Sequence, residues 1–462
     1  MDFHTALAYL DQHTNLEGNR ATRFDTHTGL GGSAGAAAPH PDPGPVMPNA
    51  GQTSGLSLEP MGVLLSALGD PHKAYRIIHV TGTNGKGSVT RFISALIQAT
   101  DLSVGAYTSP NIERINERLS WAGRPISDED FGRVIGLLAS VEPMLDIVPS
   151  RFELLTAAAF VWFAELAVDV AVVEVGLLGR FDATNVVDSD VAVVTNIGKD
   201  HTSGGPGWRQ DVAGEKAGII KPQSHLILGS PMEELAPIFE AESPRATWTR
   251  GSDFDLDSNR LAVGGRLLDL ITPEASYDEL FLPFYGRHQG DNLATAICAV
   301  EAFFGRPVQR DLIEFALTTV ELPARFEIVA REPTIILDGA HNPDGVKAVA
   351  DTLDEAFARL GSWVLVIGLL KSKDPTEMLE SIRASGFDAI ICCEPDWSRA
   401  LPAQELAAAA EAMGLSAEIV VKPVDAFHRA LAVTAADDLI MVSGTHYIVG
   451  DIRPVARAIG AA

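Results

Sequence analysis

The segment from Gly82 to Ser88, Gly-Thr-Asn-Gly-Lys-Gly-Ser, has the residue types that bind a phosphate group. Its glycines let backbone N–H groups converge on phosphate oxygens without clashes from Cβ atoms. Lys86 can neutralise the β- and γ-phosphates of ATP, and Ser88 brings a hydroxyl near the metal–phosphate site. The segment follows a short apolar run at 76–80 and precedes a helical pattern at 89–99, so a helix dipole also favours the anion. This context predicts a phosphate loop rather than a glycine-rich turn that binds nothing.

Short apolar runs and helical patterns alternate along the chain around this loop. The runs at 104–107, 170–175 and 191–196 predict buried strands, and 153–166 predicts a helix. This alternation is typical of parallel α/β units, in which ligands bind at the carboxyl ends of the strands.

A second series of the same kind follows residue 325, with strands expected at 334–337, 363–367, 389–392 and 439–442. The sequence therefore predicts an ATP-binding α/β domain with a parallel sheet at 1–320 and a smaller Rossmann-like α/β domain at 321–462. The first domain carries a stretch at about 18–55 in which twelve of the residues from 29 to 55 are Gly or Pro. We expect a surface insertion without regular structure there.

The composition excludes several classes of function. There are 35 Lys and Arg residues against 61 Asp and Glu, a formal net charge of −26, so no nucleic-acid partner is expected. The most apolar stretch, 154–164, ends at Glu165 and is too short to span a bilayer. Cys298, Cys392 and Cys393 offer neither a disulfide framework nor a zinc motif, which fits a reducing compartment. We therefore expect a cytoplasmic protein that binds small molecules and no membrane.

The spacing within the loop is unusual, because Gly87 separates Lys86 from Ser88 where the common motif has Lys followed directly by Ser or Thr. This spacing resembles the loop of the Mur ligase superfamily and, more narrowly, that of folylpolyglutamate synthase/dihydrofolate synthase. Further segments match that family in the same order: Tyr107–Pro110, Phe152–Thr156, Val173–Gly176, Gly179–Asn185, Asp200-His201, Glu215–Ile219, His288-Gln289 with Asn292, and Asp338–Pro343. The resemblance extends over most of the chain and implies a Mur-ligase-like fold.

The resemblance implies a stepwise ligation driven by ATP. ATP phosphorylates a substrate carboxylate, the amine of L-glutamate attacks the acyl phosphate, and the amide, ADP and phosphate leave. The implied acid is dihydropteroate, or a reduced folate whose glutamate tail is extended. Such chemistry depends on positioning and charge neutralisation, and the implied metal is Mg²⁺, in two copies, which prefers oxygen ligands. We expect the protein to act as a monomer.

The resemblance also implies roles for individual residues. The nucleotide would be bound by Thr83, Asn84, Gly85, Lys86, Gly87, Ser88, Gln289, Asn292, Arg325 and Asp338. The metal ligands would be Ser109, Glu174, His201 and Lys216, the last as a carbamate formed with carbon dioxide. The catalytic residues would be Lys86, Lys216 and His341. The acid substrate would lie against Ser150, Arg151, Phe152, Glu153, Phe181, Asp182 and Ala183.

Three departures from the family pattern fall on the side of the acid substrate. Asn111 stands where the family often has His, Leu178 stands where Gly is common, and the insertion at 18–55 replaces a short loop that contacts the pterin. The alternative is therefore a related Mur-type ligase acting on another acid, such as a cell-wall peptide precursor. A nucleotide-binding regulatory protein without catalysis is disfavoured, because it would not need the whole set of metal and catalytic residues.

Overall fold

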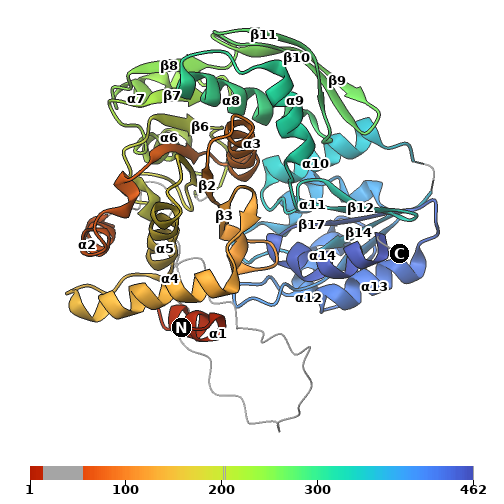
Figure 1. Cartoon of the computed structure of the whole chain (residues 1–462). Helices are drawn as coiled ribbons and strands as arrows, with labels where there is room; N and C mark the ends of the chain where they lie inside the picture. Colours follow the sequence, from red (N-terminus) through yellow and green to blue (C-terminus); the bar gives the residue numbers. More distant parts are fainter. Residues whose placement is uncertain (14–55, 201, 203, 360, 461–462) are drawn as a thin grey trace.

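The computed structural model of the 462-residue chain describes residues 1–13, 56–200, 202, 204–359 and 361–460. The expected insertion at 18–55 and the expected metal ligand His201 lie outside these residues. Two α/β units lie side by side, and the chain passes from the first to the second between helix α9 (Arg310–Thr319) and strand β12 (Glu327–Arg331) (Figure 1). This arrangement confirms the predicted α/β fold class.

The first unit is built on an eight-stranded sheet in the order β4-β3-β2-β5-β1-β6-β7-β8. Its strands are β1 (Arg76–Thr81), β2 (Val104–Tyr107), β3 (Leu119–Trp121), β4 (Arg124–Pro125), β5 (Val170–Glu174), β6 (Val191–Val194), β7 (His225–Leu228) and β8 (Ala246–Thr249). Strand β1 pairs in parallel with β5 and β6, so the loop that follows β1 leaves the middle of the sheet. All residues of β5 and β6 are buried, because helices cover both faces of a parallel sheet.

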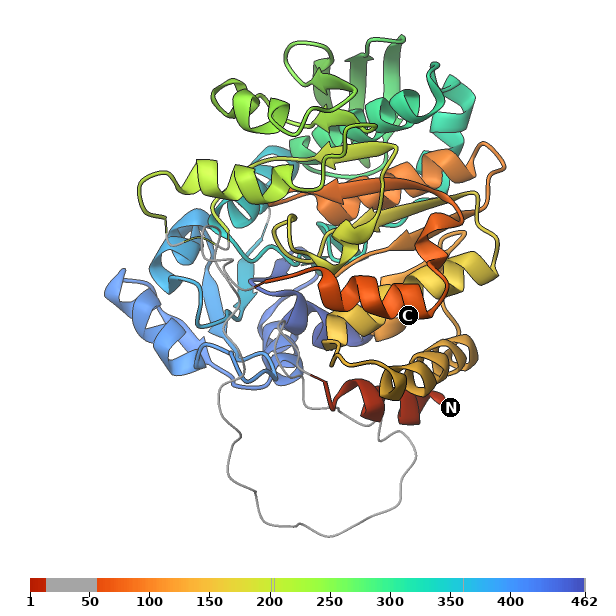
Figure 2. The ribbon, with the colours of Figure 1, turned by 90° about the vertical axis from the view of Figure 1, so that its left-hand side faces the viewer.

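Successive side chains of these strands point to opposite faces, and each face has its own helices. Ile78 and Val172 pack with helices α3 and α8 on one face, whereas Ile77 and Val173 pack with α4 and α5 on the other. Figure 2 shows the sheet with helices on both sides. The helices of this unit are α1 (Phe3–Leu10), α2 (Glu59–Ala67), α3 (Lys86–Gln98), α4 (Asp128–Val141), α5 (Arg151–Glu165), α6 (Trp208–Ala217), α7 (Ala236–Glu240), α8 (Arg287–Phe304) and α9 (Arg310–Thr319).

A three-stranded antiparallel sheet, for which the sequence predicts no strands, packs beside α8 in the order β11-β10-β9. Its strands are β9 (Asp255–Ala262), β10 (Gly265–Ile271) and β11 (Ser276–Leu282). Leu268 and Leu270 are buried in the core of the first unit, whereas no residue of β9 is buried and half of them are exposed. Apolar and polar residues alternate only weakly along β9, so its sequence does not predict a strand.

The second unit has a six-stranded sheet in the order β12-β13-β17-β14-β15-β16. Its strands are β12 (Glu327–Arg331), β13 (Thr334–Leu337), β14 (Trp363–Ile367), β15 (Ala389–Cys392), β16 (Ala417–Ile419) and β17 (Leu439–Ser443). Only β12 is antiparallel to its neighbour, so the carboxyl ends of the others share one edge. The helices are α10 (Pro343–Ala356), α11 (Pro375–Ser381) and α12 (Ala403–Ala412) on one face, and α13 (Pro423–Val433) and α14 (His446–Gly460) on the other. Across the described residues of both units, no helix has the length and apolarity needed to cross a bilayer.

Candidate active site

The phosphate loop leaves the end of β1 and becomes the first turn of α3, as predicted. Gly82 has a φ of 148° and Gly85 has a φ of 84°, and α3 begins at Lys86. The two residues that follow strand β6 hold the loop: the Thr195 hydroxyl donates to the Asn84 carbonyl at 2.6 Å, and the Asn84 N–H donates to Asn196 Oδ1 at 3.0 Å. The loop is therefore fixed before a nucleotide binds.

Replacing Gly82 with alanine is expected to displace this loop. A Cβ at Gly82 would lie 1.8 Å from Thr195 Oγ1, and its φ lies in a region that favours glycine. We expect the affinity for ATP to fall by about tenfold or more, which corresponds to about 1.4 kcal/mol. Calorimetric titration with a non-hydrolysable ATP analogue measures this change.

Gly62→Ala is the matched control, because Gly62 lies within helix α2 and an added Cβ meets nothing within 4 Å. Alanine is favoured over glycine in a helix, so this variant should bind ATP like the wild type. Equal affinities in the Gly82 and Gly62 variants would show that the loop tolerates the displacement.

Two lysines converge on one carbonyl of the loop. Lys86 Nζ donates to Gly82 O at 2.9 Å and to Thr83 O at 3.2 Å, and Lys216 Nζ, from α6, donates to Gly82 O at 3.0 Å. Lys216 is buried, and burial together with the nearby charge of Lys86 lowers its pKa to about 7. Its amine is therefore neutral in an appreciable fraction of molecules near neutral pH.

Glu174 ends β5 beside the loop, at the position expected of a metal ligand. Its buried carboxylate accepts the Ser109 N–H at 3.1 Å; burial raises its pKa, and the charges of Lys86 and Arg325 oppose that shift. Among the described residues, no three His, Cys, Asp or Glu side chains gather into a metal cluster. Glu174 and the Ser109 hydroxyl nonetheless fit Mg²⁺, which is usually bound by one or two carboxylates with water and substrate phosphates.

Arg325 reaches the same place from the start of the second unit. A Cβ at Gly87 would lie 3.6 Å from Oε2 of Glu174 and 3.8 Å from Nη2 of Arg325. The carboxylate and the guanidinium therefore lie beside the first turn of α3, one from each unit.

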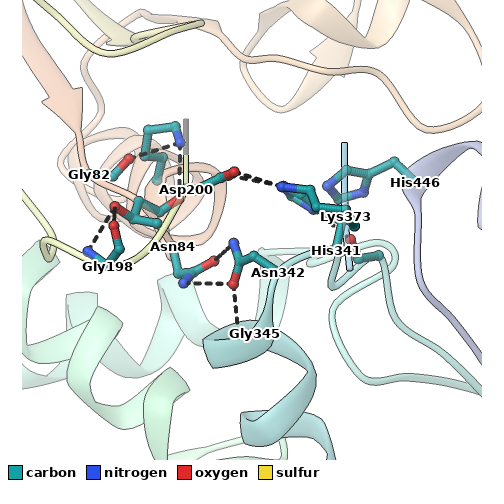
Figure 3. Close-up of polar contacts among 12 residues, drawn as sticks. Gly82, Asn84, Gly198, Asp200, His341, Asn342, Gly345, Lys373 and His446 are labelled. Carbon is teal, nitrogen blue, oxygen red and sulfur yellow. Dashed lines mark hydrogen bonds and ion pairs between the residues drawn. The ribbon is translucent and has the colours of Figure 1, made fainter. Parts of the chain in front are cut away.

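Three further residue pairs join the units at or near the loop (Figure 3). Asn342 Nδ2 donates to Asn84 Oδ1 at 2.9 Å, and Asn84 Nδ2 donates back to Asn342 Oδ1 at 3.3 Å. Lys373 Nζ lies 2.7 Å from Asp200 Oδ1, and His341 Nε2 lies 3.7 Å from Asp200 Oδ2. The candidate site is thus the junction between the two units.

The remaining residues expected to bind ATP have partners within the protein. Asn292 Nδ2 donates to Gln289 Oε1 at 3.0 Å, and a Cβ at Gly85 would lie 2.4 Å from Asn292 Oδ1. The structure therefore brings this amide pair against the loop. Asp338 is buried and accepts backbone N–H groups from Phe326 and Ala340, both at 2.7 Å. Its contact with a nucleotide stays a prediction.

The residues expected to bind the acid substrate divide into two groups. Ser150 and Glu153 form a capping box at the start of α5, and Arg151 pairs with Asp11. The side chains of Ser150 and Glu153 are thus engaged locally, and that of Arg151 is engaged with the end of α1. Phe152, by contrast, packs against the loop after β5, since a Cβ at Gly176 would lie 2.4 Å from its Cζ. The same loop carries Phe181, Asp182 and Ala183, of which Phe181 is 37% exposed.

The structure describes two of the three positions at which the chain departs from the family pattern. Leu178 has a φ of 58° and a buried side chain, and its carbonyl accepts the Thr81 hydroxyl at 2.8 Å. Asn111 Oδ1 accepts from Arg118 Nε at 3.0 Å. Leu178 therefore adopts the left-handed conformation that glycine adopts more easily.

Several residues at the junction were missed from the sequence. Asn342 lies inside the matched segment Asp338–Pro343, and an Asn before Pro predicts a helix N-cap, but no local pattern predicts its contact with Asn84. Lys373 and His446 follow strands β14 and β17, and no spacing marks either of them. His446 is buried, its Nε2 lies 3.5 Å from Arg325 Nη1, and its ring centroid lies 5.1 Å from that of His341.

Comparison with known proteins defines the class of the chain. Residues 80–300 match the Mur ligase middle domain, and residues 324–446 match the glutamate ligase domain of Mur ligases. Together with the phosphate loop at the junction, these two domains define an ATP-dependent ligase of the Mur type.

Relatives that match most of the chain narrow this class. The chain is 36% identical over 381 residues to a dihydrofolate synthase/folylpolyglutamate synthase of Mycobacterium tuberculosis, covering 77% of each chain. It is 34% identical over 404 residues to that of Bacillus subtilis, covering 85% of this chain and 93% of the relative. The chain belongs to the dihydrofolate synthase/folylpolyglutamate synthase family, as its motifs predict.

Solved structures agree with this assignment. A Mycobacterium tuberculosis folylpolyglutamate synthase complexed with ADP and AMPPCP superposes with a TM-score of 0.81 at 34% identity, over 87% of this chain and 95% of that one. An Escherichia coli FolC in complex with DHPP and ADP superposes with a TM-score of 0.79 at 30% identity, over 88% and 94% of the two chains.

Proposed function

We propose that the chain joins L-glutamate to the carboxylate of dihydropteroate, to the glutamate tail of reduced folates, or to both, while ATP is converted to ADP and phosphate. The observation that carries this proposal is the convergence of the phosphate loop, Glu174 and Arg325 at the junction of the two units. It is supported by relatives solved with DHPP and ADP, and with Mn, AMPPNP and L-glutamate. These relatives favour a folate-type acid over a cell-wall peptide precursor as the substrate, and we propose that the partners of the chain are small molecules.

In the proposed mechanism the phosphates of ATP lie along the N–H groups of the loop, and Lys86 exchanges its two carbonyl partners for phosphate oxygens. The carboxylate of the acid attacks the γ-phosphorus, and ADP leaves. The neutral amine of L-glutamate then attacks the acyl carbon, the bond from the acyl carbon to the phosphate oxygen breaks, and the proton of the amine ends on the released phosphate. Arg325 offsets negative charge from the second unit, and the closed junction keeps water from the acyl phosphate.

We propose that two Mg²⁺ ions are held by Ser109, Glu174, His201 and a carbamate on Lys216. When bound, Mg²⁺ neutralises the charge of the phosphates. The low pKa of Lys216 supports the carbamate, because only a neutral amine reacts with carbon dioxide. His341 is proposed as the third catalytic residue, with Lys86 and Lys216, because it lies between Asp200 and His446 at the junction.

Release of ADP from purified protein tests the function directly. With ATP, Mg²⁺ and L-glutamate present, release should rise only when dihydropteroate or tetrahydrofolate is added. Turnover without either acid, or with a muramyl substrate alone, would refute the folate assignment.

We further propose that the domains divide at residues 320 and 321, in the connection after α9, and that the protein acts in the cytoplasm as a monomer without nucleic acid. Light scattering during size-exclusion chromatography should then give the mass of one chain, 49.2 kDa. A mass of two chains would contradict the monomer.

A further inference from the structure

A histidine lies at the centre of the first sheet, directly beneath the phosphate loop. His79 is the fourth residue of β1, lies opposite Val173 of β5 and Ala192 of β6, and is fully buried. Burial and the charge of Lys221 lower its pKa to about 3, so the ring is neutral. No step of the proposed reaction uses this residue, yet a buried polar ring is costly unless it is hydrogen-bonded.

The ring has one hydrogen-bond partner, and that partner leads to the candidate substrate loop. His79 Nε2 lies 2.9 Å from the hydroxyl of Thr184, and the same hydroxyl lies 2.5 Å from Asp182 Oδ1. Thr184 and Asp182 belong to the loop after β5 that also carries Phe181 and Ala183. A continuous chain of polar atoms therefore runs from the core of the sheet to that loop.

The direction of the two hydrogen bonds follows from the capacity of each group. Asp182 accepts the backbone N–H of Thr184 on Oδ1 at 3.0 Å and that of Leu177 on Oδ2 at 2.8 Å. Burial raises the pKa of this carboxyl, but these hydrogen bonds oppose that shift and favour the ionised, accepting form. The Thr184 hydroxyl therefore donates its one proton to Asp182. The proton between Thr184 and His79 must then belong to His79 Nε2. This leaves Nδ1 as a bare lone pair, consistent with its lack of a partner.

These contacts leave little freedom to the Asp182 carboxylate. Oδ1 accepts both the N–H and the hydroxyl of Thr184, and Oδ2 accepts from Leu177, so each oxygen is fixed by the protein. The His79 Nε2–H occupies the side of the Thr184 oxygen that faces the ring, so the hydroxyl hydrogen points at Asp182 Oδ1.

We propose that His79 is a positioning residue for the acid substrate: its Nε2–H, acting through the Thr184 hydroxyl, holds the Asp182 carboxylate in the orientation that the pterin ring meets. The assignment rests on the proposed function, in which Asp182 lies against the acid substrate. His79, in the strand that precedes the phosphate loop, is therefore expected to affect the affinity for the acid substrate rather than the affinity for ATP.

Paired substitutions separate this role from simple packing. His79→Leu removes the donor, whereas His79→Gln can place an amide N–H near the position of Nε2; Thr184→Val removes the hydroxyl, whereas Thr184→Ser keeps it. We expect the KM for dihydropteroate to rise about tenfold in the Leu and Val variants, the scale of a lost hydrogen bond in a chain ending on a charge.

The KM for ATP should change less than about twofold, and the Gln and Ser variants should recover most of the loss. The double variant His79→Leu/Thr184→Val should be no worse than Thr184→Val alone, because both interrupt one chain.

A spectroscopic test leaves His79 itself in place. NMR of the full chain labelled with ¹⁵N-histidine, with Thr184→Val used to assign the signal, should show a neutral histidine protonated at Nε2. A proton at Nδ1 would overturn the proposal. So would an unchanged KM for dihydropteroate in Thr184→Val, or equal losses in the Leu and Gln variants. Failure of the proposed function would look different, because the wild type itself would then show no turnover that depends on dihydropteroate.

Discussion

Replacing Lys216 with alanine is expected to abolish ligation, with a loss of about a thousandfold or more in kcat/KM, the scale reported for removing a group that stabilises charge in phosphoryl transfer. The reason is geometric. Lys216 Nζ lies 3.0 Å from the Gly82 carbonyl, and the side chain is buried beside the loop. A carbamate there would bring two oxygens to the edge of the phosphate site.

The same variant should recover part of its activity with short-chain carboxylates such as formate or acetate, which can occupy the position of the carbamate. Lys216→Arg is the sharper companion, because it keeps a cation but cannot form a carbamate, and it should be as inactive as the alanine variant. Lys73→Ala is the matched control, since Lys73 is exposed and donates to Asp70 Oδ2 at 2.8 Å, three residues earlier in the chain. Full activity in Lys216→Ala would refute a catalytic role for this lysine.

The pKa of Lys216 also predicts a pH dependence. A lysine with a pKa near 10.5 is neutral in about one molecule in 3,000 at pH 7, whereas a pKa near 7 makes about half of the molecules neutral. The shift is downward, so the reactive amine is present above pH 7 and is lost as the pH falls below it. Activity measured at fixed carbon dioxide should therefore decline on the acid side of pH 7, and the carboxylate-rescued alanine variant should lack this decline.

Replacing Lys86 with alanine is expected to cause the second large loss, about a thousandfold in kcat/KM for ATP, because no other side chain of the loop carries a positive charge. Lys86 now donates to Gly82 O and Thr83 O, which places its ammonium within the curve of the loop where the phosphates would lie. Steady-state release of ADP measures the effect. Lys347→Ala serves as the control, because Lys347 is exposed on α10 and pairs only locally with Asp351.

The order of the two variants separates binding from catalysis. Lys86→Ala should also weaken the binding of an ATP analogue, whereas Lys216→Ala should leave that binding within a few-fold of the wild type. If Lys86→Ala bound the analogue normally and released ADP at the normal rate, the loop would not be the site of phosphate binding.

Much of the fold could be predicted from the sequence because its buried strands are short runs of β-branched residues between helical patterns. The strands at 170–174 and 191–194 follow from Val-rich runs, and the loop at 82–88 follows from its glycines and lysine. The sheet of β9, β10 and β11 could not, because β9 alternates too weakly and β10 buries a charged residue, Arg266, where an apolar residue would be expected.

The contacts between the two units could not be predicted from the sequence, for a different reason. Asn84 and Asn342 are 258 residues apart, and Asp200 and Lys373 are 173 residues apart, so no local spacing joins them. The capping box of Ser150 and Glu153, in contrast, is written locally as Ser-x-x-Glu before an apolar helix and could have been recognised. Contacts between residues close in sequence can thus be predicted from the sequence, whereas contacts between the two units cannot.

The central claim is that the phosphate loop serves to activate a carboxylate as an acyl phosphate. Dihydropteroate labelled with ¹⁸O in its carboxylate tests this claim most directly, with ATP, Mg²⁺ and L-glutamate present and the released phosphate analysed by mass spectrometry. The carboxylate oxygen that attacks the γ-phosphorus leaves with the phosphate, so one ¹⁸O per amide should appear in inorganic phosphate. Amide formation accompanied by unlabelled phosphate would contradict the account.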